Sequence, residues 1–163
     1  MSDPHPARER ELAQDSVKAV GQILSNYQAA LHLFEEAVGG SASVPPQLTR
    51  ALLQQAARDV FAPVLDACAG VAPGLDDLVT ESMAAAAAPA PAVLDLVVAE
   101  RERVAVTHSR LIRRQPRLIE AAGESAAVAA AARRLDDLQI GSHSAGALFN
   151  LLFERWSDLQ RGR

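Results

Sequence analysis

The chain is poor in the residues on which many extracellular and nucleic-acid-binding folds depend. It has one cysteine, Cys68, in 163 residues, so no intramolecular disulfide can form and a reducing compartment is expected. Aromatic residues make up 4% of the sequence, which leaves little material for a β-sandwich or for a surface that stacks bases. The polar N-terminal residues lack the apolar run of a secretory signal. We therefore expect a cytoplasmic protein.

Long apolar runs are also missing. The most apolar window, residues 83–99, is mostly alanine, contains Pro89 and Pro91, and carries Asp95. It is shorter than the roughly 20 residues that a membrane-spanning helix needs. No membrane association is predicted.

Catalytic and metal-binding signatures are absent from the sequence. We find no glycine-rich phosphate loop and no paired base and nucleophile. His32 has the helical spacing of a metal pair with Glu35 and Glu36, but di-iron bundles repeat a Glu-x-x-His element on two helices, and here the order is reversed and occurs once. The sequence therefore predicts no enzyme, no metal and no cofactor.

Helical periodicity is what the sequence has in abundance. In residues 17–38 seven apolar side chains follow one another at alternating intervals of three and four, which is the a/d pattern of a helix packed against other helices. They are Val17, Val20, Leu24, Tyr27, Leu31, Phe34 and Val38. Four more residues, Ile23, Ala30, Leu33 and Ala37, are expected to widen this pattern into a face that contacts two neighbours.

The first helix is predicted to run from Pro4 or Ala7 to Val38, where Gly39-Gly40 ends it. Its length of roughly 45–50 Å exceeds the diameter of about 40 Å expected for a compact chain of this size. The molecule should therefore be elongated. Ser2 or Asp3 is the predicted N-terminal cap.

The remaining periodic segments predict four or five further helices. The second follows Ser43 and Val44-Pro45-Pro46, kinks at Pro63 and ends at Gly70, and a short helix follows over residues 75–87. A fourth covers residues 91–114 and breaks or bends at Pro116 before resuming to Gly123. A fifth runs from Ser125 to Gly141, and a sixth begins at Ser142 or Ser144. Leu48 in the second helix and Leu94 in the fourth are among the side chains expected to point inward.

These segments predict an all-α fold, an elongated bundle of about five or six helices with a long N-terminal helix. We interpret residues 1–163 as a single helical domain with an alanine- and proline-rich joint near residues 84–91. Residues 1–89 have five basic and eleven acidic side chains, and residues 90–163 have eleven basic and nine acidic. Because unlike charges attract, we expect the acidic and mildly basic halves to face each other, either within one molecule or across a dimer.

An arginine cluster is the first candidate binding feature. Arg110, Arg113, Arg114 and Arg117 follow the i, i+3, i+4, i+7 spacing that gathers side chains on one helical face. Guanidinium groups match carboxylates and phosphates, so the predicted partner is an anionic group: a phosphate, a nucleic acid or an acidic helix of a protein. The alternative is a solvated face that pairs with the acidic half of the chain. A nucleic-acid partner is disfavoured by the formal net charge of −4 and by the lack of interleaved aromatic residues.

Arg101 and His108 form the second candidate. They lie seven residues apart, and therefore on one side of the predicted fourth helix, within its apolar face. They could bind a small ligand, or they could be a partly buried arginine and a hydrogen-bonded core histidine.

The sequence thus predicts a non-enzymatic protein–protein interaction protein of the adaptor or scaffold type, which associates with itself or with another protein. The alternative is a regulatory or sensor domain that binds a small ligand or cofactor through Arg101 and His108.

Overall fold

The computed structural model describes residues 5–39, 44–84, 92–123 and 125–162, with the side chains of residues 5–7 and 125 left out. Six helices make up the described part of the chain: α1 (His5–Val38), α2 (Pro46–Cys68), α3 (Pro73–Ser82), α4 (Val93–Glu120), α5 (Ser125–Ile140) and α6 (Ala145–Gln160). No strand occurs among these residues. The predicted all-α bundle with a long first helix is confirmed.

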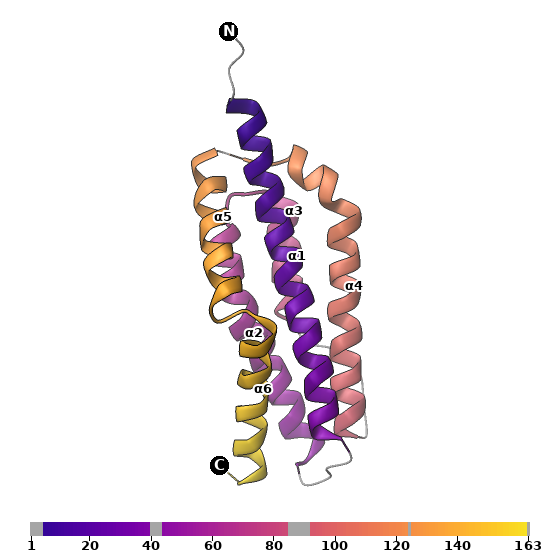
Figure 1. Cartoon of the computed structure of the whole chain (residues 1–163). Helices are drawn as coiled ribbons and strands as arrows, with labels where there is room; N and C mark the ends of the chain where they lie inside the picture. Colours follow the sequence, from indigo (N-terminus) through magenta and orange to yellow (C-terminus); the bar gives the residue numbers. More distant parts are fainter. Residues whose placement is uncertain (1–4, 40–43, 85–91, 124, 163) are drawn as a thin grey trace.

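From α1 to α5 the helices run alternately down and up along one long axis, and α6 runs in the same direction as α5 (Figure 1). In that view α1 lies in front, between α4 on one side and α5 with α6 on the other, while α2 and α3 lie behind it. The α5 and α6 helices continue roughly end to end beside α1, and α1 extends beyond the other helices at its N-terminal end. The elongated shape follows from the length of α1, which spans 34 residues.

The core lies along the buried side of α1. All seven predicted a/d residues of α1 are at most 2% exposed, and Phe34 and Tyr27 anchor two edge-to-face aromatic pairs. The ring centroids are 5.8 Å apart for Phe34 and Trp156 of α6, and 5.4 Å apart for Tyr27 and Phe61 of α2. The single thiol of Cys68 is buried in this core.

Three predicted core leucines lie on the surface instead. Leu33, Leu48 and Leu94 are 43%, 45% and 40% exposed, and Ala37 is exposed as well. Neighbouring helices cover α1 along a narrower arc than the prediction assumed, which leaves Leu33 at its edge. Near the start of α2 and of α4, Thr49 and Leu96 take the inward positions.

Of the two alternatives predicted at Pro116, the break does not occur, because α4 continues through this residue to Glu120, whereas a bend is present near this end (Figure 1). Pro116 lies on the exposed side of the helix, where water can hydrate the carbonyl of Ile112 that loses its amide partner. The ribbon of α4 bends toward α1 near this end (Figure 1).

The ends of the other helices follow the sequence signals with small shifts. The α2 helix stops before Gly70, which has a φ of +88°, and Ser144 caps α6 by accepting a hydrogen bond from the amide of Ala147 at 3.2 Å. The short helix α3 ends at Ser82, earlier than predicted. The predicted caps Ser2 and Asp3 lie outside the described residues, as do Ser43 before the second helix and residues 85–91 of the predicted joint.

Candidate functional site

Two open grooves flank the exposed side of α1. One lies between α1 and α5 and the other between α1 and α4. Lys18 and Gln22 project between them and line both.

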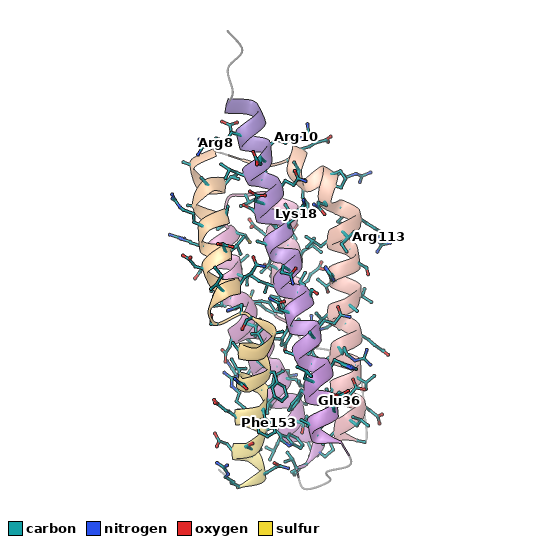
Figure 2. All side chains as sticks on the ribbon, viewed as in Figure 1. Arg8, Arg10, Lys18, Glu36, Arg113 and Phe153 are labelled. Carbon is teal, nitrogen blue, oxygen red and sulfur yellow. The ribbon has the colours of Figure 1, made fainter. Side chains whose placement is uncertain are left out.

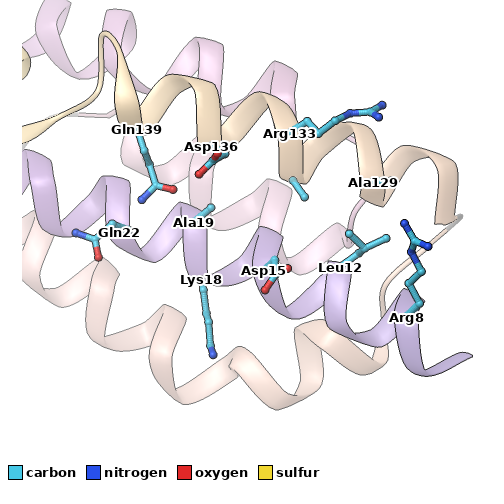
Figure 3. A pocket seen from close by; sticks show the side chains of 11 residues that line it. Arg8, Leu12, Asp15, Lys18, Ala19, Gln22, Ala129, Arg133, Asp136 and Gln139 are labelled. Atoms are coloured by element: carbon cyan, nitrogen blue, oxygen red, sulfur yellow. The ribbon is translucent and has the colours of Figure 1, made fainter.

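The α1–α5 groove has a volume of about 610 Å³. Ala19 of α1 and Ala129 and Ala132 of α5 leave it open, because their short side chains do not fill the space between the helices. Charged and amide side chains border it (Figure 3): Arg8, Asp15, Lys18, Gln22, Arg133, Asp136 and Gln139. Since both signs of charge occur, the groove has no single electrostatic preference.

The α1–α4 groove consists of two adjoining cavities of about 310 and 370 Å³, which share Ser25 and His108. Small residues of α1 at intervals of four, Gly21, Ser25 and Ala29, provide its width. A Cβ atom on Gly21 would approach a methyl carbon of Leu111 to 3.1 Å and Nε2 of His108 to 3.8 Å. The glycine therefore gives the His108 ring its place against α1.

Arg101 and His108 both line this groove, rather than pointing into the core. Arg101 is held by Glu35 of α1, with Nε and Oε2 2.8 Å apart, so part of its charge is neutralised. His108 forms no hydrogen bond with any described residue, and burial lowers the pKa of its imidazole. No described residue that lines the groove is acidic. The groove therefore favours an anionic or neutral polar group beside His108.

The four clustered arginines are not equivalent in the structure. Arg110 forms an ion pair with Glu81 of α3, with Nη2 and Oε2 2.6 Å apart. Arg113 points away from the bundle (Figure 2). Arg114 and Arg117 are also exposed. Three of the four guanidinium groups thus remain open to solvent, while Arg110 ties α4 to α3.

The acidic and basic halves of the chain meet within one molecule. Three ion pairs between helices each join an acid from residues 1–89 to an arginine from residues 90–163: Glu35–Arg101, Glu81–Arg110 and Asp59–Arg155. Burial alone would raise the pKa of Asp59, but hydrogen bonds from Arg155 and Gln55 hold it below its ordinary value. At least part of the charge asymmetry therefore serves the fold.

Glu100 of α4 is a buried carboxylate that the sequence patterns did not predict. Glu100 is 1% exposed and forms an ion pair with Arg103. The Arg103 guanidinium also donates to the carbonyl of Ser82, with Nη2 and the oxygen 3.1 Å apart. A cation is favourable there because the site lies at the C-terminal end of α3, where the aligned peptide dipoles leave a partial negative charge. The i, i+3 spacing of Glu100 and Arg103 was the available signal.

His143, in the turn between α5 and α6, also has a role that its sequence position did not indicate. Its side chain is 4% exposed; Nε2 lies 2.6 Å from the carbonyl of Val60, and Nδ1 lies 2.8 Å from Oγ of Ser142. Nε2 must carry the proton to donate to a carbonyl. Burial lowers the pKa of His143, although the hydrogen bond to Val60 opposes this effect. His143 is therefore a structural residue that fixes the α5–α6 turn to α2.

Two general features of the described residues bear on function. They contain no group of three or more His, Cys, Asp or Glu side chains placed to hold a metal ion. Burial raises the pKa of Cys68 to about 12, so its thiol stays protonated near neutral pH.

Among the described helices, none combines the length and the apolar character that crossing a bilayer requires.

No protein-family model, curated protein or solved structure matches this chain.

Proposed function

We propose that the protein is a non-enzymatic interaction protein of the adaptor or scaffold type, which associates with itself through the face formed by α5, α1 and α4. The observation that carries this proposal is the pair of open grooves along both flanks of α1. Helices commonly recognise other proteins by laying one helix along such a groove. A reducing, cytoplasmic setting is part of the proposal, supported by the free, buried Cys68.

The shape of the grooves favours a helix over a small molecule as the occupant. Ligand pockets enclose most of the ligand surface, whereas these grooves are open along their length. The residues of α1 that line the α1–α5 groove extend from Arg8 to Gln22, which corresponds to about 21 Å of helix. That length matches about four turns of a docked helix.

Sedimentation velocity between about 1 and 300 μM tests the proposal directly. We expect an average mass that rises above the monomer value of 17.3 kDa with concentration. Ala29→Trp places a large side chain in the α1–α4 groove and should weaken the association, because Ala29 is exposed and lines that groove.

The matched control is Ala62→Trp, at an exposed alanine of α2. It adds the same side chain behind the α5–α1–α4 face and should leave the association unchanged. A protein that stays at 17.3 kDa throughout the range would contradict self-association, and an equal effect of both variants would place the contact elsewhere.

A second candidate function is binding of a small anion by Arg101 and His108. It is favoured by their position in one cavity of about 370 Å³ and by the absence of a protein hydrogen-bond partner for His108 among the described residues. An NMR titration with sodium phosphate follows the ring protons of the histidines. Saturable shifts at His108 that disappear in Arg101→Ala would support this function, and shifts of equal size at His143, which lies outside this cavity, would indicate a nonspecific effect.

A further inference from the structure

The exposed side of α1 carries a second heptad pattern, opposite the one that packs into the core. Six residues follow one another at intervals of four, three, four, three and four: Lys18, Gln22, Ser25, Ala29, His32 and Glu36. Five of them are exposed and Ser25 is half-buried. Because this spacing keeps side chains on one line along a helix, it is the spacing by which a second helix packs against the first. We call these six residues the outer seam.

The charges of the outer seam are complementary to those of the outer seam of a second copy that runs in the opposite direction. Lys18 and Glu36 lie at its two ends, Gln22 and His32 follow inward, and Ser25 and Ala29 lie at the centre. The members of each pair are equally distant from position 27. An antiparallel second copy with its two-fold axis at that position would therefore place a lysine opposite a glutamate at both ends of the contact.

Neither end of the outer seam is satisfied by a strong ion pair within one molecule. Lys18 forms no ion pair with any described residue. Glu36 lies 3.6 Å from Nε2 of His32, and both of these side chains are more than half exposed. Figure 2 shows Lys18 and Glu36 on the same helix, well separated along its axis. Both charges are thus available to a partner.

The centre of the outer seam permits a close approach. Ser25 and Ala29 have short side chains, and the α1–α4 groove beside them leaves room for the flanking residues of a partner helix. The α1–α5 groove borders the part of α1 from Arg8 to Gln22, at the N-terminal end of the seam. Small residues at a helix crossing let two backbones come close together, which improves packing along the line of contact.

Charge also selects one register over its neighbour. Shifting the antiparallel pairing by one heptad toward the N-terminus would place Glu11 opposite Glu36 and Lys18 opposite Ala29. This arrangement replaces two attractive contacts by two repulsive ones. Only pairing about position 27 makes both ends of the seam favourable.

We propose that α1 binds α1 of a second copy of this chain in antiparallel orientation along the outer seam, with Lys18 opposite Glu36 of the second copy. This inference rests on the proposed self-association and specifies its partner, surface and register. Since the contact is symmetric, each charge pair occurs twice in the dimer.

A charge-reversal cycle tests the pairing. Lys18→Glu and Glu36→Lys each place two like-charged pairs across the two-fold axis, and each should raise the dimer dissociation constant about tenfold or more at low salt. The double variant Lys18→Glu/Glu36→Lys restores opposite charges and should return the constant to within about threefold of wild type. The effects of the single variants should shrink at about 0.5 M salt.

Controls separate this pairing from general charge effects. Asp66→Lys reverses an exposed charge on α2, behind the α5–α1–α4 face, and should leave the dissociation constant unchanged. Circular dichroism establishes that each variant is folded. A second measurement uses Ser25→Cys/Ala29→Cys, which should form disulfide-linked dimers on mild oxidation, whereas Ala62→Cys/Asp66→Cys on α2 should not.

The outcomes distinguish the two proposals. If the wild type dimerises but the charge reversals have no effect, or if the double variant is not restored, the antiparallel pairing is wrong while self-association stands. If the wild type remains monomeric at every concentration, both proposals fail.

Discussion

Two leucines of α1, two positions apart, provide a sharp test of the helical phase on which the fold and the outer seam both depend. Leu31 is 0% exposed and Leu33 is 43% exposed, although both were predicted to face inward. Leu31→Ala and Leu33→Ala make the same chemical change in the same helix, so differences in helix propensity cancel. What remains is the difference in burial.

The expected losses follow from the exposed fractions. Leucine to alanine removes three carbon groups, worth about 2.4 kcal/mol of transfer free energy when fully buried. At Leu31 the cavity left in the core adds to this value, for a total of about 2–5 kcal/mol. At Leu33 a little over half of the side chain is buried, so the loss should be about 1.4 kcal/mol, and water fills the space left behind.

Urea unfolding followed by circular dichroism at 25 °C measures both losses, with a common m-value. It should be done at two protein concentrations, because self-association stabilises the folded state by mass action. Equal losses at the two positions, or a larger loss at Leu33 at the lower concentration, would refute the assigned phase of α1 and with it the outer seam.

Three further predictions test structural contacts. A Cβ on Gly123 would lie 2.7 Å from a backbone carbonyl oxygen of the α2–α3 turn, so Gly123→Ala should lower the free energy of unfolding in a urea melt by about 1–3 kcal/mol. The control is Gly146→Ala in α6, where a Cβ meets no other atom, and it should raise the free energy of unfolding by about 0.5–1 kcal/mol. The pKa of His143 is lowered in the folded protein, so the unfolded chain binds the proton of this histidine more tightly than the folded chain does. The free energy of unfolding should therefore be highest above about pH 7.5 and should fall as the pH drops below about 6.5 toward the pKa of the folded state. His143→Asn should reduce this pH dependence in urea melts between about pH 7.5 and 5.5. Arg103→Met removes the guanidinium group that contacts buried Glu100 and the end of α3. In thermal or urea unfolding this variant should lower the free energy of unfolding by about 3–5 kcal/mol, more than the control Arg113→Met at an exposed position of the same helix.

The fold was predictable from the sequence because helix phase and helix ends are local properties. The alternating intervals in α1, Gly70 after α2 and Ser144 before α6 each act within a few residues of themselves. The errors fall where the answer depends on neighbours. Leu33, Leu48 and Leu94 have the right residue type for a core, but the adjoining helices do not cover them.

The polar contacts were beyond the reach of periodicity for the same reason. His143 binds the carbonyl of Val60, 83 residues earlier in the chain. Glu100 lies on the buried side of α4, where a carboxylate is unfavourable unless a partner such as Arg103 accompanies it. For Arg101 and His108 the sequence correctly placed both on one side of a helix, but only the packing of α4 against α1 shows that this side borders a groove.

The two heptad patterns of α1 differ in a way that bears on how the proposed dimer would behave. The buried pattern is entirely apolar apart from the hydroxyl of Tyr27, and it contributes to a core that cannot be exposed without unfolding. The outer seam contains no large apolar side chain, so separation of the two copies would uncover no apolar patch along the seam. An interface built from two ion pairs and small residues gains little from apolar burial, and its charge pairs are screened by salt. Self-association through this surface should therefore be reversible and should depend on protein concentration and ionic strength. An adaptor needs a reversible contact of this kind if its second copy is to be replaced by a helix of another protein.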